Sequence, residues 1–117
     1  MPNLLRIAPE LPASDLKRSI EYYEAKLGFA NVMTMPDGGY AIVERDGVAI
    51  HLFQTDRHSP QSIHIFAEGL DELHAELRGR GAHLKQDILF QPWGNRDFRV
   101  NDDFGNEIKF TEPVEES

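Results

Sequence analysis

Gly47-Val48-Ala49-Ile50-His51-Leu52, in the middle of the chain, is echoed near its end by Gly105-Asn106-Glu107-Ile108-Lys109-Phe110. Each copy follows a tight-turn signal and continues as a short run with strand character. The interval between the copies is about half of the chain, which is too long for the repeat unit of a solenoid. The echo therefore predicts two copies of one module that pair and enclose a site between them.

An amphipathic helix is predicted ahead of each copy. In the first helix the apolar residues are spaced by 4, 3 and 4 positions, which places Leu16, Ile20, Tyr23 and Leu27 on one face. Ser14 and Asp15 provide an N-cap, and Gly28 provides a C-terminal stop. The second helix is predicted over residues 70–80, with its apolar face formed by Leu70, Leu73 and Leu77.

Eight strands are predicted around the two helices. They cover residues 4–8, 29–33, 40–44 and 48–54 in the first half, and 62–67, part of 82–90, 96–100 and 107–111 in the second. The first strand is expected to stop before Pro9 and Pro12, because proline cannot donate to an inner ladder. The order predicts an α+β fold of two paired βαβββ modules in a single domain, residues 1–117. Module one is about 1–57, module two about 58–112, and residues 113–117 form an acidic tail.

The composition of the chain argues against several classes of function. The chain has 117 residues, no cysteine and a net charge of −8, from 12 basic and 20 acidic residues. This charge argues against nucleic acid as a partner, since phosphate contacts need a clustered basic surface. No apolar run approaches the ~20 residues of a membrane span, and no signal peptide precedes the first predicted strand. We therefore expect a cytoplasmic protein without membrane or nucleic-acid partners.

Strand alternation separates two faces of the predicted sheets. Ile50, Leu52, Ile63, Ile65, Ile108 and Phe110 share the face expected to pack under the helices. The opposite face carries His51, Phe53, Ser62, His64, Phe66, Glu107 and Lys109. A sheet face that mixes aromatic and polar residues is a candidate cavity lining. The alternative is a half-exposed sheet face without a ligand.

Several local motifs resemble the vicinal oxygen chelate superfamily (glyoxalases, bleomycin resistance proteins and extradiol dioxygenases), most closely the bleomycin resistance branch. They lie in the first helix, the second helix, a Pro-Trp-Gly segment and the last turn. In this sequence they read Ser14-Asp15-Leu16 with Ser19-Ile20-Glu21-Tyr22-Tyr23 and Leu27-Gly28-Phe29, then Gly69 to Leu77, Gln91-Pro92-Trp93-Gly94, and Asp102-Asp103-Phe104-Gly105-Asn106. The last motif departs from the family pattern at Asp103, where proline is usual. The resemblance spans nearly the whole chain and implies the glyoxalase/bleomycin-resistance-type fold.

Metalloenzymes of this superfamily hold their metal at four equivalent strand positions. The resemblance places Ala8, His51, Ser62 and Lys109 there. Alanine cannot coordinate a metal, serine is a poor ligand, and a protonated lysine repels a divalent cation. We therefore expect no metal, no other cofactor and no catalytic residue. The alternative is a metal-dependent glyoxalase-type lyase or dioxygenase that holds a divalent metal at a displaced site of His51, His64 and Glu107.

The resemblance implies non-catalytic sequestration of a small molecule in a groove at a homodimer interface, as in antibiotic resistance by bleomycin binding. We expect a bleomycin-like or other flat heteroaromatic ligand, cationic if the charge of −8 acts on ligand choice. Trp93 and Tyr40 fall where the family stacks aromatic side chains on its ligand. The predicted ligand-binding residues are Trp93, Tyr40, His51, Phe53, His64, Phe66 and Lys109. Glu44 or Asp97 would complement a cation. A partner-binding module without a pocket is a third possibility.

Overall fold

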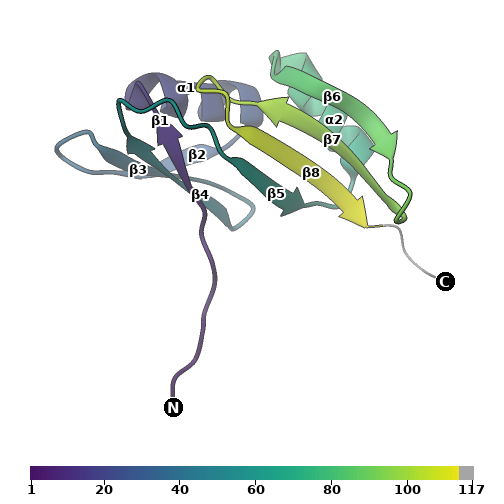
Figure 1. Ribbon diagram of the computed structural model, residues 1–117, viewed down its shortest axis with the longest axis horizontal. Coiled ribbons are helices and arrows are strands. Elements are labelled where there is room, and N and C mark those ends of the chain that lie inside the picture. The colour runs from purple at the N-terminus through teal and green to yellow at the C-terminus, as the bar shows by residue number, and fades with distance from the viewer. Residues whose placement is uncertain (114–117) are drawn as a thin grey trace.

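The computed structural model describes residues 1–113, which form eight strands and two helices in the order β-α-β-β-β, repeated once (Figure 1). The first module consists of β1 (Glu10–Ala13), α1 (Leu16–Leu27), β2 (Ala30–Thr34), β3 (Tyr40–Arg45) and β4 (Val48–Gln54). The second consists of β5 (Ser62–Phe66), α2 (Leu70–Arg80), β6 (His83–Phe90), β7 (Asn95–Asn101) and β8 (Glu107–Pro113). The predicted fold class is confirmed. The predicted acidic tail, apart from Pro113 at the end of β8, lies outside the described residues.

Each module has one four-stranded sheet, and both sheets have the same strand order, β1-β4-β3-β2 and β5-β8-β7-β6. The first strand of each module runs parallel to the last, and the other neighbours are antiparallel. Figure 1 shows the two sheets side by side, with both helices on the same side of them. The matching order explains why the two sequence copies, which lead into β4 and β8, occupy equivalent central strands.

The helix-facing sides of the strands form the core. Ile50, Leu52 and Ile108 are fully buried, whereas His51 and Lys109, the alternate residues of the same strands, are half-buried. The predicted strand faces are therefore confirmed for β4 and β8. Helix α1 starts at the predicted N-cap, since the Asp15 side chain accepts a hydrogen bond from the Arg18 N–H, and it ends at Gly28 in the left-handed conformation, φ 73°.

A buried hydrogen-bond cluster in the β7–β8 turn joins the two modules. Asp102 Oδ1 accepts from the backbone N–H groups of Phe104, Gly105 and Asn106 at 3.0, 3.0 and 2.9 Å. Asp102 Oδ2 accepts from the Tyr23 hydroxyl of α1 at 2.7 Å. Burial raises the pKa of Asp102 despite these hydrogen bonds.

Asn106 extends this cluster to the two strands that begin the modules. Its Nδ2 donates to the carbonyl of Pro12 in β1 at 2.9 Å, and its Oδ1 accepts from the Gln61 N–H next to β5 at 2.9 Å. The asparagine is fully buried. The turn from Asp102 to Asn106 is thus a structural joint between the two modules.

The first predicted strand is wrong. Residues 4–8 form an extended arm that projects from the body of the molecule (Figure 1), and Leu4, Leu5 and Ile7 are 99%, 81% and 94% exposed. The strand lies later in the chain, because Leu11 can pack into the core there while the arm residues contact nothing comparable. Pro12 is tolerated because β1 is an edge strand, where a missing N–H costs no inner ladder bond. Among residues 1–113, no helix is long and apolar enough to cross a bilayer.

Candidate ligand-binding groove

A groove of about 710 Å³ runs between the arm, β4 and β5. This volume lies within the usual range for small-molecule sites. Most of its lining is apolar, with two histidines, one carboxylate and one arginine. The lining residues are Arg6, Ile7, Ala8, Pro9, Val32, Ile42, Glu44, Gly47, Val48, Ala49, Ile50, His51, Ile63, His64, Ile65 and Phe66. The groove thus joins the first module to the second along the seam between their sheets.

His51 is held by a short hydrogen-bond chain. The Tyr40 oxygen lies 2.6 Å from Glu10 Oε2 and 2.6 Å from His51 Nδ1. A phenol has one proton, and the Glu10 carboxylate is an acceptor, so Tyr40 donates to Glu10 and accepts from His51 Nδ1–H. The hydrogen bond to Glu10, with partial desolvation, raises the pKa of Tyr40 to about 12. This chain leaves Nε2 as the free acceptor nitrogen of neutral His51.

His64 is the second histidine of the groove. Its Nε2 is hydrogen-bonded to the Thr111 hydroxyl of β8, and its ring stacks on Phe66 with centroids 4.5 Å apart. Partial desolvation, followed by the positive charge of Lys109 opposite it, lowers the pKa of His64. His64 is therefore predominantly neutral at pH 7 and does not repel a cation.

Of the two carboxylates suggested to complement a cationic ligand, only one lines the groove. Glu44 is exposed and lines the groove. Asp97 is only 1% exposed, and its Oδ1 accepts from Gln86 Nε2 at 2.7 Å. Glu44 is therefore the acidic group that the groove offers to a ligand.

The structure brings together only part of the predicted set. His51, His64 and Phe66 line the groove, and Tyr40 lies behind His51. Phe53 instead lines a neighbouring cavity of about 590 Å³, together with Glu10 of β1.

Lys109 and Trp93 also lie outside the groove lining. Lys109 pairs with His64 across β5 and β8. Trp93, in the β6–β7 turn, is 65% exposed and lines none of the cavities described here. Within one chain, the proposed stacking residue is therefore separate from the histidines.

The alternative metal set does not fit. Glu107 accepts from Lys85 Nζ at 2.6 Å and faces Arg99 at 3.4 Å, and these contacts lower its pKa. Residues 1–113 contain no group of three or more histidines and carboxylates close enough to hold a metal ion, so His51, His64 and Glu107 form no such group. Ala8, at a family ligand position, lies on the arm and has no donor atom.

Glu10 and the arm residues that line the groove were not among the predicted site residues. Glu10 pairs with His51 in the parallel β1–β4 ladder. It was missed because the first strand was predicted over residues 4–8, before Glu10. Leu11 and Ala13, the two apolar residues that flank Pro12, could have indicated the observed strand, since both are buried.

Comparisons with known proteins agree with this architecture. A family model described as "Glyoxalase superfamily protein" matches residues 3–117. A bleomycin resistance protein from Geobacillus stearothermophilus is 30% identical over 132 residues, covering 95% of this chain and 98% of that protein.

Two solved structures show the same fold. The bleomycin-binding protein from bleomycin-producing Streptomyces verticillus, complexed with copper(II)-bleomycin, has a TM-score of 0.81 at 23% identity, over 99% of this chain and all of that one. Lactoylglutathione lyase from Agrobacterium tumefaciens has a TM-score of 0.77 at 17% identity, over 96% of each chain. The family model and the bleomycin resistance relative carry the assignment beyond the fold. The chain belongs to the glyoxalase superfamily, as its motifs predicted.

Proposed function

We propose that this protein sequesters a small, flat, cationic antibiotic of the bleomycin type without changing it chemically. The observation that carries the proposal is the groove, which combines apolar walls with neutral His64, an acceptor on His51 and the carboxylate of Glu44. The bleomycin resistance relative, similar over 95% of this chain, supports the same ligand class. The groove can hold a ligand, and its residues offer no set of metal ligands within 1–113.

Each part of the groove matches one property of such a ligand. The Phe66 ring, 62% exposed and stacked on His64, offers a face to a planar heteroaromatic. Stacking of this kind contributes about 0.5–1.5 kcal/mol beyond the burial of area. Glu44 attracts positive charge, and His51 Nε2 accepts a hydrogen bond from an N–H or O–H donor.

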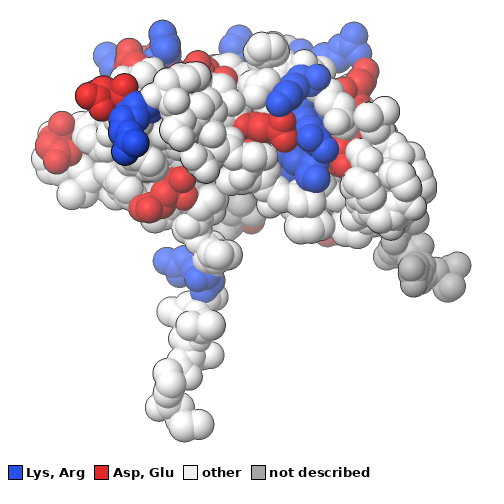
Figure 2. Space-filling model, in the orientation of Figure 1, with Lys and Arg blue, Asp and Glu red and all other residues white. Residues whose placement is uncertain are grey.

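We further propose that the functional form is a homodimer. The arm leaves Leu4, Leu5 and Ile7 in solvent, and Figure 2 shows most of the arm without charged side chains. Burying such side chains against a second copy would contribute roughly 1.5–3 kcal/mol each. Trp93 would then reach the ligand from the partner subunit. Light scattering should give twice the chain mass for the full protein and a monomer after deletion of residues 1–7.

Fluorescence titration tests the ligand. Trp93 is the single tryptophan of the chain, so its emission reports on one place. Bleomycin should cause a saturable change at micromolar concentration. The absence of any saturable change, checked by calorimetry, would remove bleomycin as the ligand.

Charge variants test the groove. Glu44→Gln should weaken bleomycin binding 3- to 10-fold, because it removes the carboxylate that lines the groove. Glu24→Gln is the matched control, since Glu24 is an exposed carboxylate on α1 outside the groove. Equal losses in both variants would indicate long-range attraction by the net charge instead of a local contact.

A metal-dependent lyase is the second candidate, favoured by the shared fold with lactoylglutathione lyase. Elemental analysis of protein purified without chelator separates the two functions. Stoichiometric iron, zinc, nickel or manganese that is lost in His51→Ala would support the enzyme. Metal-free protein that still binds bleomycin would support sequestration.

A further inference from the structure

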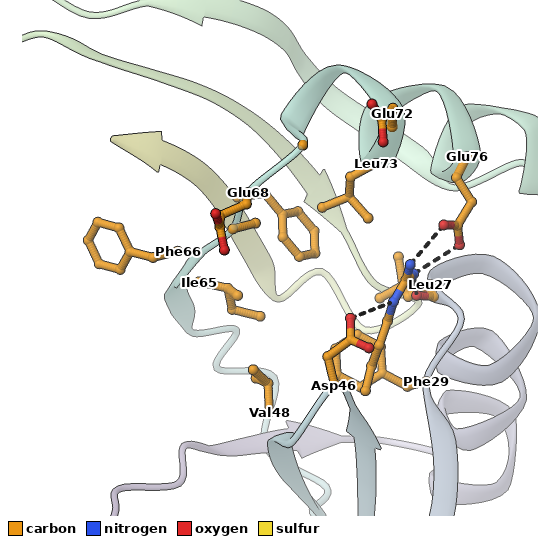
Figure 3. A pocket seen from close by; sticks show the side chains of 14 residues that line it. Leu27, Phe29, Asp46, Val48, Ile65, Phe66, Glu68, Glu72, Leu73 and Glu76 are labelled. Carbon is orange, nitrogen blue, oxygen red and sulfur yellow. Dashed lines mark hydrogen bonds and ion pairs between the residues drawn. The ribbon is translucent and has the colours of Figure 1, made fainter. Parts of the chain in front are cut away.

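A further cavity, of about 460 Å³, lies at the seam between the modules (Figure 3). It is bounded by the β3–β4 turn, the end of β5 and the first half of α2, and we call it the seam pocket. Its walls are largely apolar, with Leu73 of α2, Ile65 of β5 and Phe110 of β8 among them. The volume suits a small organic molecule. Val48, Ile65 and Phe66 border both the seam pocket and the groove.

The polar groups of the seam pocket are mainly acidic. Asp46, Glu68, Glu72 and Glu76 line it, against Arg45 as the one basic residue in the lining. Figure 3 shows these carboxylates distributed around the apolar walls. The lining therefore carries a formal charge of 1 − 4 = −3.

Arg45 is unavailable to an anionic ligand. Its Nη1 donates to the Leu27 carbonyl and to Glu76 Oε2, both at 2.9 Å, and its Nη2 donates to Glu76 Oε1 at 2.7 Å. The hydrogen bonds with Glu76 raise the pKa of Arg45. Arg45 Nε also lies 3.7 Å from Asp46 Oδ2, and Arg80 Nε donates to Glu76 Oε2 at 2.8 Å, so the two arginines balance Asp46 and Glu76. The uncompensated negative charge of the pocket lining resides on Glu68 and Glu72.

The α2 N-terminus does not offset this charge. Helix N-termini attract anions through their free N–H groups. Here Glu112 Oε2 already accepts from the Gly69 N–H at 2.8 Å and from the Leu70 N–H at 3.4 Å. Glu68 and Glu72, in contrast, make no side-chain hydrogen bond or ion pair within residues 1–113. They are free to meet a ligand.

We propose that the seam pocket is a second ligand site, which binds a small organic monocation with an aromatic or aliphatic body. The apolar body packs against Ile65, Leu73 and Phe110, and the ammonium group lies between Glu68 and Glu72. Apolar walls provide affinity, and the carboxylates select the charge. The site uses neither histidine of the groove, so it stands whether or not the groove binds bleomycin.

Three probes of one shape and different charge test this site. They are 2-(1-naphthyl)ethylamine, a cation; 2-(1-naphthyl)ethanol, which is neutral; and 1-naphthylacetate, an anion. Amide chemical shifts of ¹⁵N-labelled protein, at one ionic strength, measure both location and affinity. We expect the cation to bind at least 5-fold more tightly than the other two. Its shifts should centre on residues 46–48 and 65–73.

Paired variants isolate the carboxylates. The double substitution Glu68→Gln with Glu72→Gln should lower the affinity for the cationic probe at least 5-fold. Glu21→Gln with Glu24→Gln changes the net charge equally on exposed α1 positions and should leave affinity within 2-fold. Retained amide dispersion in both proteins verifies that they fold.

The remaining outcomes contradict the proposal. Equal affinity for the three probes would show that the seam pocket binds through its apolar walls without charge selectivity. Equal losses of affinity in both paired variants would show that the net charge of the protein, and not Glu68 and Glu72, attracts the cation. Shifts confined to residues around His51 and His64 would assign cation binding to the groove alone.

Discussion

Tyr40→Phe gives the sharpest test of the groove geometry, because it removes one oxygen that two groups share. That oxygen lies 2.6 Å from both Glu10 Oε2 and His51 Nδ1. Its single proton goes to the carboxylate, so His51 must donate from Nδ1. The structure therefore assigns neutral His51 to the Nδ1–H tautomer, with Nε2 free to accept from a ligand.

The size of the effect follows from one hydrogen bond. A net intramolecular hydrogen bond contributes about 0.5–1.5 kcal/mol. At ~1.4 kcal/mol per tenfold, its loss changes the tautomer ratio of His51 by about 2- to 12-fold toward Nε2–H. In the Nε2–H form, that nitrogen donates instead of accepting. A ligand that donates to His51 should therefore bind more weakly, by at most about the same 2- to 12-fold, because its affinity scales with the fraction of His51 in the Nδ1–H form.

Long-range ¹H–¹⁵N spectra of histidine-labelled protein at pH 8 measure the tautomer directly. His64 is an internal reference, because its contacts with Thr111 and Phe66 do not involve Tyr40. His51 should show mainly Nδ1–H in the unmodified protein and a shift toward Nε2–H in the variant, while His64 stays unchanged. A mainly Nε2–H signal for His51 in the unmodified protein, or the same ratio in both proteins, would show that Tyr40 does not accept a hydrogen bond from His51 Nδ1.

Three other substitutions test the Glu10–Tyr40 hydrogen bond, the buried Asn106 between the modules, and His64. Glu10→Gln should move the pKa of Tyr40 from about 12 back toward 10.0, measured by ultraviolet titration, because the carboxylate is the main cause of the rise. Asn106→Ala should lower the free energy of unfolding in urea by about 2–4 kcal/mol, since it leaves buried backbone groups unpaired, whereas Asn3→Ala, on the exposed arm, should change it by less than about 1 kcal/mol. The pKa of His64 is lowered below 6.5, so its contribution to stability is present above that pH and is lost as pH falls through the folded-state pKa. His64→Gln should therefore lose less stability between pH 7 and pH 5 than the unmodified protein, and an equal loss would contradict this sign.

Both helices could be predicted from sequence because their signals are local. The cap at Asp15, the stop at Gly28 and the apolar spacing between them determine α1 within its own residues. The alternation of Ile50, His51 and Leu52 likewise fixes which side chains face the core once β4 is a central strand. That alternation placed His51 on the groove side.

The first strand and the position of Trp93 could not be predicted in this way. Leu4 to Ile7 is more apolar than Glu10 to Ala13, yet only the latter pairs with β4. Strand choice there depends on the tertiary contact of Leu11 with the core and of Pro12 with Asn106. Trp93 was assigned by resemblance to a site that, in the proposal, is completed by a second copy. No local pattern carries that information.

Isothermal titration of bleomycin, followed by mass spectrometry of the released ligand, tests sequestration without chemical change. We expect saturable binding at micromolar concentration, with one ligand for each groove, and recovery of the bleomycin with its mass unchanged. No binding heat at ligand concentrations up to a millimolar, or release of a ligand with altered mass, would contradict sequestration as the function.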